Sequence, residues 1–325
     1  MTEVPSGSRV PEPVLPSVTV TILTWNGERY LGDILGALDD QQYGGAFDVL
    51  VVDSGSTDRT LQIVAEHPSV RLHEIPNEEF GHGTTRNLAA ELATGEIVAY
   101  LTHDAVPLGE DWLASLVAPM IDDASVVAVL GRQVARPSAP PLLKYDIDRV
   151  FARLSPDGGV SVFFDDGSLD EHARSLATFY SDACSAARRD ILLHHVPYRD
   201  VDYAEDQVFG RELIDAGYRK AYAPAAVVEH SNDGTLREFG ARIAADLMGL
   251  RRIGTPIEPV SRFDAFKQWV KWTLMDTGRI VSDPDYSFGR KLYWLVVNPV
   301  YHAVKWSNYR RASLGDPAQA QVSGS

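Results

Sequence analysis

The first 130 residues alternate between short apolar runs and segments whose apolar residues recur at helical spacing. The run 18–25 has strand length and is rich in β-branched residues, and Leu31, Ile34, Leu35 and Leu38 follow at intervals of three and four. This alternation predicts an α/β fold built on a doubly wound, mostly parallel sheet. Further strands are expected at 47–53, 70–75, 96–103 and 126–134, with helices at 85–92 and 111–121.

The pattern changes after a proline-rich segment at 137–141. Asp-Gly turn signals make 137–180 loop-rich, a helix is expected at 205–216 before Gly217, and a strand leads to His230. The remainder is expected to be mostly helical. The predicted organisation is a mobile tail at 1–17, an α/β domain at 18–234 with halves at 18–134 and 135–234, and a C-terminal helical region at 235–325.

Composition narrows the classes of function. The formal net charge of −15 argues against a nucleic-acid partner, but a metal ion can still reconcile an acidic site with a nucleotide's phosphates. The single cysteine fits a reducing cytosol, so a cytoplasmic location is expected. The proline-rich start has no signal-peptide pattern, and no apolar run has membrane-spanning length.

The run at 96–103 is rich in apolar, β-branched and aromatic residues, and the carboxylate of Asp104 follows directly after it. Ligands of open α/β sheets bind beyond the carboxyl ends of the strands, and a hard oxygen ligand there suits Mg²⁺ or Mn²⁺ on a diphosphate. The structural alternative is a helix N-cap or a turn before Pro107.

Two further segments carry polar residues at strand or helix ends. Asp53 closes the second strand before Ser-Gly-Ser-Thr-Asp, which suits hydrogen bonds to a nucleoside or a plain capping turn. Arg86 lies at a helix start behind two glycines, where it can meet phosphate oxygens or act as a structural ion-pair partner. Neither segment is a Gly-rich dinucleotide motif or a P-loop.

The acidic pair Glu205-Asp206 and the strand-end His230 complete the candidate chemistry. Acids in the first turn of a helix are ordinary partners of the helix dipole, and the functional alternative is a general base for an alcohol nucleophile. A lone histidine is commonly structural, but its imidazole also suits a divalent ion.

Taken in order, these segments resemble family 2 inverting glycosyltransferases of the GT-A fold. The resemblance covers about two thirds of the chain, from Val18 to His230. It lies in the opening segment Thr24-Trp25-Asn26-Gly27, the turn Val52-Asp53-Ser54-Gly55-Ser56-Thr57-Asp58, the segments Arg86-Asn87 and Ala93-Thr94-Gly95-Glu96, and the pair Glu205-Asp206.

The resemblance is greatest to the rhamnosyltransferase branch. Three segments carry it: His82-Gly83-Thr84-Thr85-Arg86-Asn87, Thr102-His103-Asp104-Ala105-Val106-Pro107 and Tyr180-Ser181-Asp182-Ala183-Cys184-Ser185-Ala186. One departure is that the Asp-x-Asp metal motif keeps only its last acid, Asp104, which puts strict metal dependence in question.

What the resemblance implies is transfer of L-rhamnose from dTDP-L-rhamnose to a hydroxyl of a glycan or polyprenyl-linked glycan in cell-wall or surface polysaccharide synthesis. It implies Asp206 as catalytic base, and Mg²⁺ or Mn²⁺ held by Asp104 and His230. The donor-binding residues implied are Thr24, Asn26, Asp53, Arg86, His103 and Asp104. A homo-oligomer is also compatible with it.

The segment 287–311 reverses the overall charge, because it has five Lys and Arg and no acid among several Trp and Tyr. Such a segment suits peripheral contact with an anionic membrane. The alternative is a helical hairpin whose basic residues face the acidic body or a second subunit.

Rival functions differ in what they require. A UDP-sugar would change only the donor, whereas a nucleotidyltransferase would need a basic, Gly-rich phosphate loop near the start, which Thr24–Glu28 lacks. A non-catalytic sugar-nucleotide-binding protein fits the reduced metal motif but gives the Glu205-Asp206 pair no role.

Overall fold

The computed structural model describes residues 15–201, 203–231, 235–252 and 257–315. Within these ranges the strands form one mixed sheet in the order β3-β2-β1-β4-β8-β6-β9-β5, with β7 paired to β9. The predicted α/β class is confirmed, and the predicted tail at 1–17 falls mostly outside the described residues. The strands are β1 (Val18–Thr24), β2 (Phe47–Asp53), β3 (Val70–Glu74), β4 (Ile97–Thr102), β5 (Val106–Pro107), β6 (Val126–Val134), β7 (Ser161–Phe163), β8 (Cys184–Arg188) and β9 (Arg219–Glu229).

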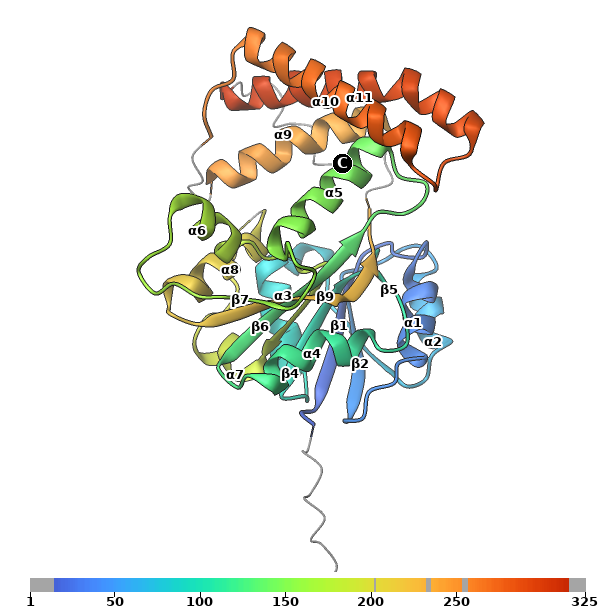
Figure 1. Cartoon of the computed structure of the whole chain (residues 1–325). Coiled ribbons are helices and arrows are strands. Elements are labelled where there is room, and N and C mark those ends of the chain that lie inside the picture. The colour runs from blue at the N-terminus through green and yellow to red at the C-terminus, as the bar shows by residue number, and fades with distance from the viewer. Residues whose placement is uncertain (1–14, 202, 232–234, 253–256, 316–325) are drawn as a thin grey trace, which may run out of the picture.

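Helices cover both faces of the sheet, and the C-terminal helices lie beyond its carboxyl edge (Figure 1). They are α1 (Leu31–Asp39), α2 (Thr60–Ala65), α3 (His82–Leu92), α4 (Trp112–Asp122), α5 (Pro141–Leu154), α6 (Glu171–Thr178), α7 (Arg189–His194), α8 (Glu205–Asp215), α9 (Leu236–Arg252), α10 (Arg262–Ser282) and α11 (Phe288–Ser313). None of the helices in the described ranges combines the length and the hydropathy that crossing a membrane would need.

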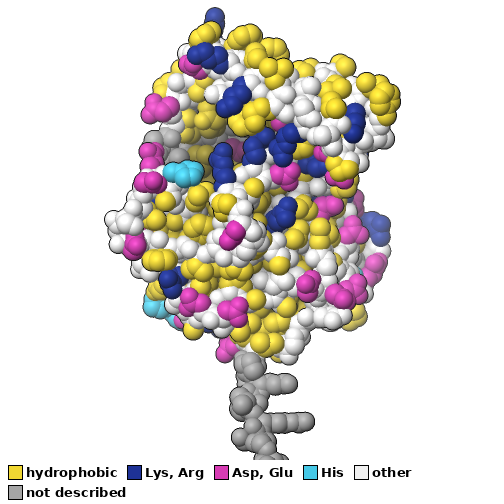
Figure 2. Space-filling view, in the orientation of Figure 1, with side chains coloured by type: hydrophobic (Ala, Val, Ile, Leu, Met, Phe, Trp, Pro, Cys, Tyr) yellow, Lys and Arg dark blue, Asp and Glu magenta, His cyan; other side chains and the backbone are white. Residues whose placement is uncertain are grey.

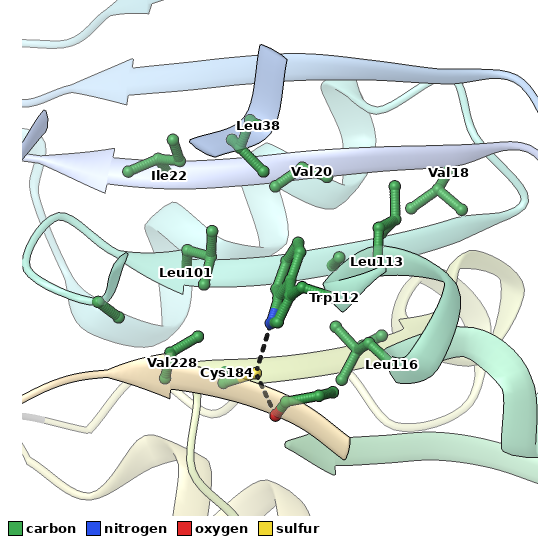
Figure 3. Packing of buried hydrophobic residues seen from close by; sticks show 14 of the residues in the cluster. Val18, Val20, Ile22, Leu38, Leu101, Trp112, Leu113, Leu116, Cys184 and Val228 are labelled. Atoms are coloured by element: carbon green, nitrogen blue, oxygen red, sulfur yellow. Dashed lines mark hydrogen bonds between the residues drawn. The ribbon is translucent and has the colours of Figure 1, made fainter. Parts of the chain in front are cut away.

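Alternation along the strands divides the core in two. On β2, Val49 and Val51 face α1, α2 and α4, whereas Leu50 and Val52 belong to the layer with α3, α5, α7 and α8. On the first side Trp112 is fully buried, and its indole N–H donates to the sulfur of Cys184 at 3.3 Å (Figure 3). The sole cysteine is therefore part of the core, and burial raises the pKa of its thiol to about 12.

The expected loop-rich character of 137–180 is wrong in part, because α5, β7 and α6 lie there. Helix α5 begins with Pro141 in its first turn and buries Leu142, Tyr145, Phe151 and Leu154, so proline starts a helix here instead of a loop. The segment 180–186, which carries part of the resemblance to rhamnosyltransferases, runs into β8, and β8 lies antiparallel between β4 and β6.

Register places the ends of three central strands together. Thr24 pairs with Asp53 across β1 and β2, and Leu23 pairs with Thr102 across β1 and β4, all in parallel. The antiparallel pair Val106–Glu229 then brings β5, just after Asp104, beside the end of β9. Polar residues from four segments therefore meet at one edge.

Candidate active site

The turn after β2 is organised around the carboxylate of Asp53. Its Oδ2 accepts hydrogen bonds from the hydroxyls of Thr24 at 2.7 Å and Ser56 at 2.6 Å, and its Oδ1 accepts from the backbone N–H groups of Gly55 and Ser56. Asp53 has no exposed surface. These contacts give Thr24 and Asp53 a positioning role beneath the turn, and direct contact with a nucleoside stays a prediction.

Asn26 joins the turns after β1 and β2 at the surface. Its backbone has φ = 50°, its N–H donates to the Ser56 hydroxyl, and its Oδ1 accepts from the Thr57 N–H at 2.9 Å. Next to it, the Trp25 N–H donates to Nδ1 of His103 at 3.4 Å. A β-carbon at Gly27 would lie 3.2 Å from that of His103, so glycine lets the His103 ring approach the turn.

Asp104 and His230 form a carboxylate–imidazole pair. The distance from Asp104 Oδ2 to His230 Nε2 is 3.4 Å, and both side chains keep some exposed surface. Nδ1 of His230 donates to Gln133 Oε1 at 2.9 Å, which leaves Nε2 facing the carboxylate. Burial alone would raise the pKa of Asp104, but its contacts with His230 lower it well below the usual range.

Arg136 supports the backbone on both sides of this pair. Its guanidinium donates to the carbonyl oxygens of Asp104 and Ser231, and it stacks on the Tyr30 ring at 3.8 Å. The side chain is almost wholly buried. Arg136 thus holds the chain after β4 against the chain after β9.

A second cluster is built on Arg86, whose guanidinium lies between two carboxylates. Its Nε is 2.7 Å from Asp182 Oδ2 and its Nη1 is 2.6 Å from Glu205 Oε1, with all three side chains buried. The remaining oxygen of Asp182 accepts from the hydroxyls of Ser185 and Tyr198. These contacts correspond to the structural ion-pair alternative for Arg86.

Asp206 lies at the edge of this cluster in the first turn of α8. The preceding Ala204 has φ = 60°, a left-handed conformation that is uncommon for a residue with a β-carbon. Burial, together with the neighbouring carboxylates of Glu205 and Asp182, raises the pKa of Asp206 to about 8. A carboxylate in this range is basic enough to take a proton from an alcohol as the alcohol reacts.

A chain of polar contacts joins the two clusters. Beyond His230, Gln133 donates from Nε2 to the Ser181 hydroxyl at 2.8 Å. Ser181 precedes Asp182, Asp182 pairs with Arg86, and Arg86 pairs with Glu205 next to Asp206. The contacts thus run from Asp104 to Glu205, the residue before Asp206.

A cavity of about 550 Å³ opens beside the first cluster. One wall is formed by Asn26, Gly27, Arg29, Tyr30, His103 and Asp104, and the opposite wall by residues of α5, α9 and α11. Asp246 of α9 lines it and bonds to the hydroxyl of Tyr203, three residues before Asp206. The C-terminal helices therefore complete the cavity.

The chain resembles known proteins in both sequence and fold. The sequence model of the family described as Glycosyl transferase family 2 matches residues 19–194, more than half of the chain. The chain belongs to glycosyl transferase family 2. Two curated relatives of this glycosyltransferase are O-antigen chain rhamnosyltransferases. RfbN of Salmonella typhimurium is 31% identical over 224 residues, 68% of each chain, and WbaN of Salmonella anatum is 28% identical over 227 residues, 69% of each.

Solved structures confirm the GT-A fold of the glycosyltransferase. Mannosyltransferase PcManGT from Pyrobaculum calidifontis, in complex with GDP-Man and Mn²⁺, has a TM-score of 0.59 at 20% identity, covering 96% of this chain and 92% of that one. S. aureus TarS 1–349 in complex with UDP has a TM-score of 0.52 at 19% identity, covering 92% and 90%.

The structure distributes the predicted site residues of the glycosyltransferase over two places. Asn26, His103 and Asp104 line the cavity and His230 contacts Asp104, whereas Arg86 and Asp206 belong to the second cluster and are not among the lining residues. Thr24 and Asp53 lie beneath the first wall. Their catalytic and binding roles stay predictions.

Sequence reasoning missed the residues that join these places. Gln133 is the next-to-last residue of β6, and Arg136 lies two residues beyond its end. The strand-end argument made for Asp104 could therefore have included both. Arg242 and Asp246 line the cavity from α9, where only their spacing of four on an amphipathic helix was available as a signal.

Proposed function

We propose that this glycosyltransferase moves L-rhamnose from dTDP-L-rhamnose to a hydroxyl of a glycan or polyprenyl-linked glycan, with inversion, in surface polysaccharide synthesis. The names of RfbN and WbaN support the sugar and the type of product. The observation that carries the proposal is the polar chain from Asp104 and His230 to Asp206. It supports the proposal because it connects the residues expected to face the donor phosphates with the cluster that contains the expected base.

The Asp104–His230 pair fits a divalent metal ion. A carboxylate oxygen faces an imidazole nitrogen whose partner nitrogen is held by Gln133, an arrangement common around metal-binding histidines. No group of three or more His, Cys, Asp or Glu side chains surrounds a common point within the described ranges, so donor phosphates and water would supply the other ligands. When bound, Mg²⁺ or Mn²⁺ stabilises the negative charge of the leaving diphosphate.

The other residues bind, orient and move a proton. We infer that Asn26 and His103 contact the donor, with Arg29 of the same wall adding positive charge near its phosphates. Because Nδ1 of His103 accepts from Trp25, its Nε2 carries the proton and is a donor for a phosphate oxygen. Asp206 takes the proton of the acceptor hydroxyl as it attacks from the face opposite the diphosphate.

Asp104→Ala is expected to weaken binding of dTDP in the presence of Mn²⁺ by about 10- to 100-fold, the scale of loss when a metal site is damaged. Binding without Mn²⁺ should change little, because only the ion's contribution is removed. Calorimetric titration of dTDP with and without Mn²⁺ measures both values. Asp111→Ala, which removes an exposed acid a few residues along the chain, is the matched control. An unchanged Mn²⁺ dependence in Asp104→Ala would refute the metal role of this residue.

A thermal-shift panel tests the donor. dTDP, UDP and GDP and their sugar conjugates are each added with and without Mn²⁺. A ligand at one hundred times Kd stabilises the folded state by about 2.7 kcal/mol, so specific binding raises Tm measurably. We expect the largest metal-dependent shift with dTDP and dTDP-L-rhamnose.

Each other outcome of the panel has a distinct meaning. A shift confined to UDP compounds would keep the glycosyltransferase and reject rhamnose as the sugar. Absence of any shift would overturn the donor site. A shift with dTDP-L-rhamnose but no release of dTDP by hydrolysis or transfer, with a glycan present, would favour a non-catalytic binding protein.

A further inference from the structure

The two last helices present an apolar outer face that no part of the described structure covers. On α10 the exposed residues Phe263, Phe266, Leu274 and Val281 recur at spacings that place them on one side of the helix. On α11, Phe288, Leu292, Val296 and Val300 lie four apart, and Phe288 and Val296 are 78% and 75% exposed. In Figure 2 hydrophobic side chains accordingly gather over the end of the molecule formed by these helices.

The inner face of the same helices is used by the fold. Trp294 and His302 of α11 are buried, His302 pairs with the buried Asp276 of α10 at 2.8 Å, and Lys305 pairs with Asp146 of α5. The expected packing of basic residues against the acidic body is thus present on this side. These contacts involve only the inner face, so packing on the acidic body does not account for the exposed apolar residues on the outer face.

Charge distinguishes this end of the chain from the rest. Residues 262–313 contain nine Lys and Arg and four Asp and Glu, whereas the whole chain has a net charge of −15. Two of the four acids, Asp276 and Asp283, are buried and paired with cations. Exposed cations at the margins of the apolar rows include Arg262, Lys267 and Lys271 on α10 and Arg311 on α11.

We propose that the outer face of α10 and α11 docks on the surface of an anionic lipid bilayer. Apolar side chains would enter the boundary between headgroups and acyl chains, while the marginal Lys and Arg contact anionic headgroups. A second copy of this chain fits less well, because a two-fold dimer would oppose the same cationic face on both subunits. The acidic remainder of the protein would be repelled by the membrane, which selects this orientation.

Docking in this orientation would place the cavity close to the lipid. Tyr301 lines the cavity from α11, and Val300 beside it is exposed on the outer face. An α-helix with its side chains is about 10–12 Å across, so one helix separates the cavity from the docking face. In this respect the inference deepens the proposed function, because it favours an acceptor carried on a membrane lipid.

Vesicle flotation of the full chain tests the docking without any nucleotide. We expect the protein to float with vesicles of phosphatidylcholine plus phosphatidylglycerol and to remain below with phosphatidylcholine alone. The triple variant Phe288→Ser, Leu292→Ser and Val296→Ser should lose most of the floating fraction. The control Leu72→Ser, Val160→Ser and Val162→Ser, which removes three exposed apolar side chains elsewhere, should float like the wild type.

Two further measurements make the result decisive. Circular dichroism melting of both triple variants should match the wild type, since all six positions are already exposed, so loss of flotation cannot be attributed to unfolding. Flotation of the α11 triple variant equal to the wild type, or no flotation of the wild type with anionic vesicles, would overturn the proposal. A dimer in light scattering that the α11 triple variant dissociates would instead assign the face to a second copy. Failure of the donor proposal would leave flotation unchanged.

Discussion

Asp206→Asn is expected to lower turnover by about 10²–10⁴, the usual contribution of a positioned general base. Asparagine has nearly the same shape but cannot accept the proton of the acceptor hydroxyl. Binding of dTDP should stay close to wild type, because Asp206 lies in the cluster with Asp182, Arg86 and Glu205 and not on the cavity wall with Asp104. Initial rates with saturating donor, together with a dTDP titration, measure both quantities.

The control for this variant is Asp215→Asn, which alters an exposed acid on the same helix that pairs with Arg174. Its turnover should match the wild type. Loss of dTDP binding in Asp206→Asn would place Asp206 on the donor side and remove its assignment as base.

The raised pKa of Asp206 also sets the direction of the pH profile. The pKa is about 8, so the carboxyl group is increasingly protonated as the pH falls through 8, and a protonated carboxyl cannot act as base. Wild-type kcat/KM should therefore rise from pH 6, pass half of its maximum near pH 8 and level off about one pH unit higher. The apparent pKa belongs to the carboxylate cluster as a whole, so removing a neighbouring charge should move it.

Arg86→Met is expected to destabilise the fold by about 3–5 kcal/mol, since it leaves two buried carboxylates without their cation. Burial already raises the pKa of Asp182, and loss of the Arg86 guanidinium, which lowers it, raises it further, so protonation of Asp182 at low pH relieves part of this cost. Acids with raised folded-state pKa values contribute stability that is lost as the pH rises. The deficit relative to wild type should therefore be larger at pH 8 than at pH 5, as measured by urea denaturation.

Arg174→Met is the matched control, because Arg174 also contacts two carboxylates, Asp165 and Asp215, but at the surface. Its cost should be about 1 kcal/mol or less and nearly independent of pH. If Arg86→Met were no more destabilising than Arg174→Met, the cluster would not need its cation, and a role for Arg86 in binding the donor would regain support.

The sequence predicts the sheet well where strands are continuous apolar runs. The bounds of β2 and β6 agree with the expected ranges, because an interior strand covered on both faces is apolar over most of its length. Strand β8 was missed because Cys-Ser-Ala-Ala-Arg has little β propensity of its own. Its position between β4 and β6 imposes the extended conformation, as tertiary contacts commonly do.

The candidate site could be predicted only as far as strand ends reveal it. Parallel strands place Asp53 and Asp104 at one edge, and the end of β9 adds His230. The partners that fix these residues are far away in sequence. Gln133 is 97 residues from His230, and Arg136 is 95 residues from Ser231. No local pattern encodes such pairs, and the α9 wall depends wholly on how the C-terminal helices pack.

Because one wall of the cavity comes from the sheet edge and the other from the C-terminal helices, ligand affinity depends on how firmly these helices pack. A ligand that contacts both the sheet edge and α9 must hold the two together, and separating them must expel it. A substitution that merely loosens the packing of α9 on α11 would thus appear in a titration as weakened affinity, although the altered side chain touches no ligand. A binding defect caused by a residue of the C-terminal helices that does not line the cavity therefore reports on how the site is assembled and not on contact with the ligand.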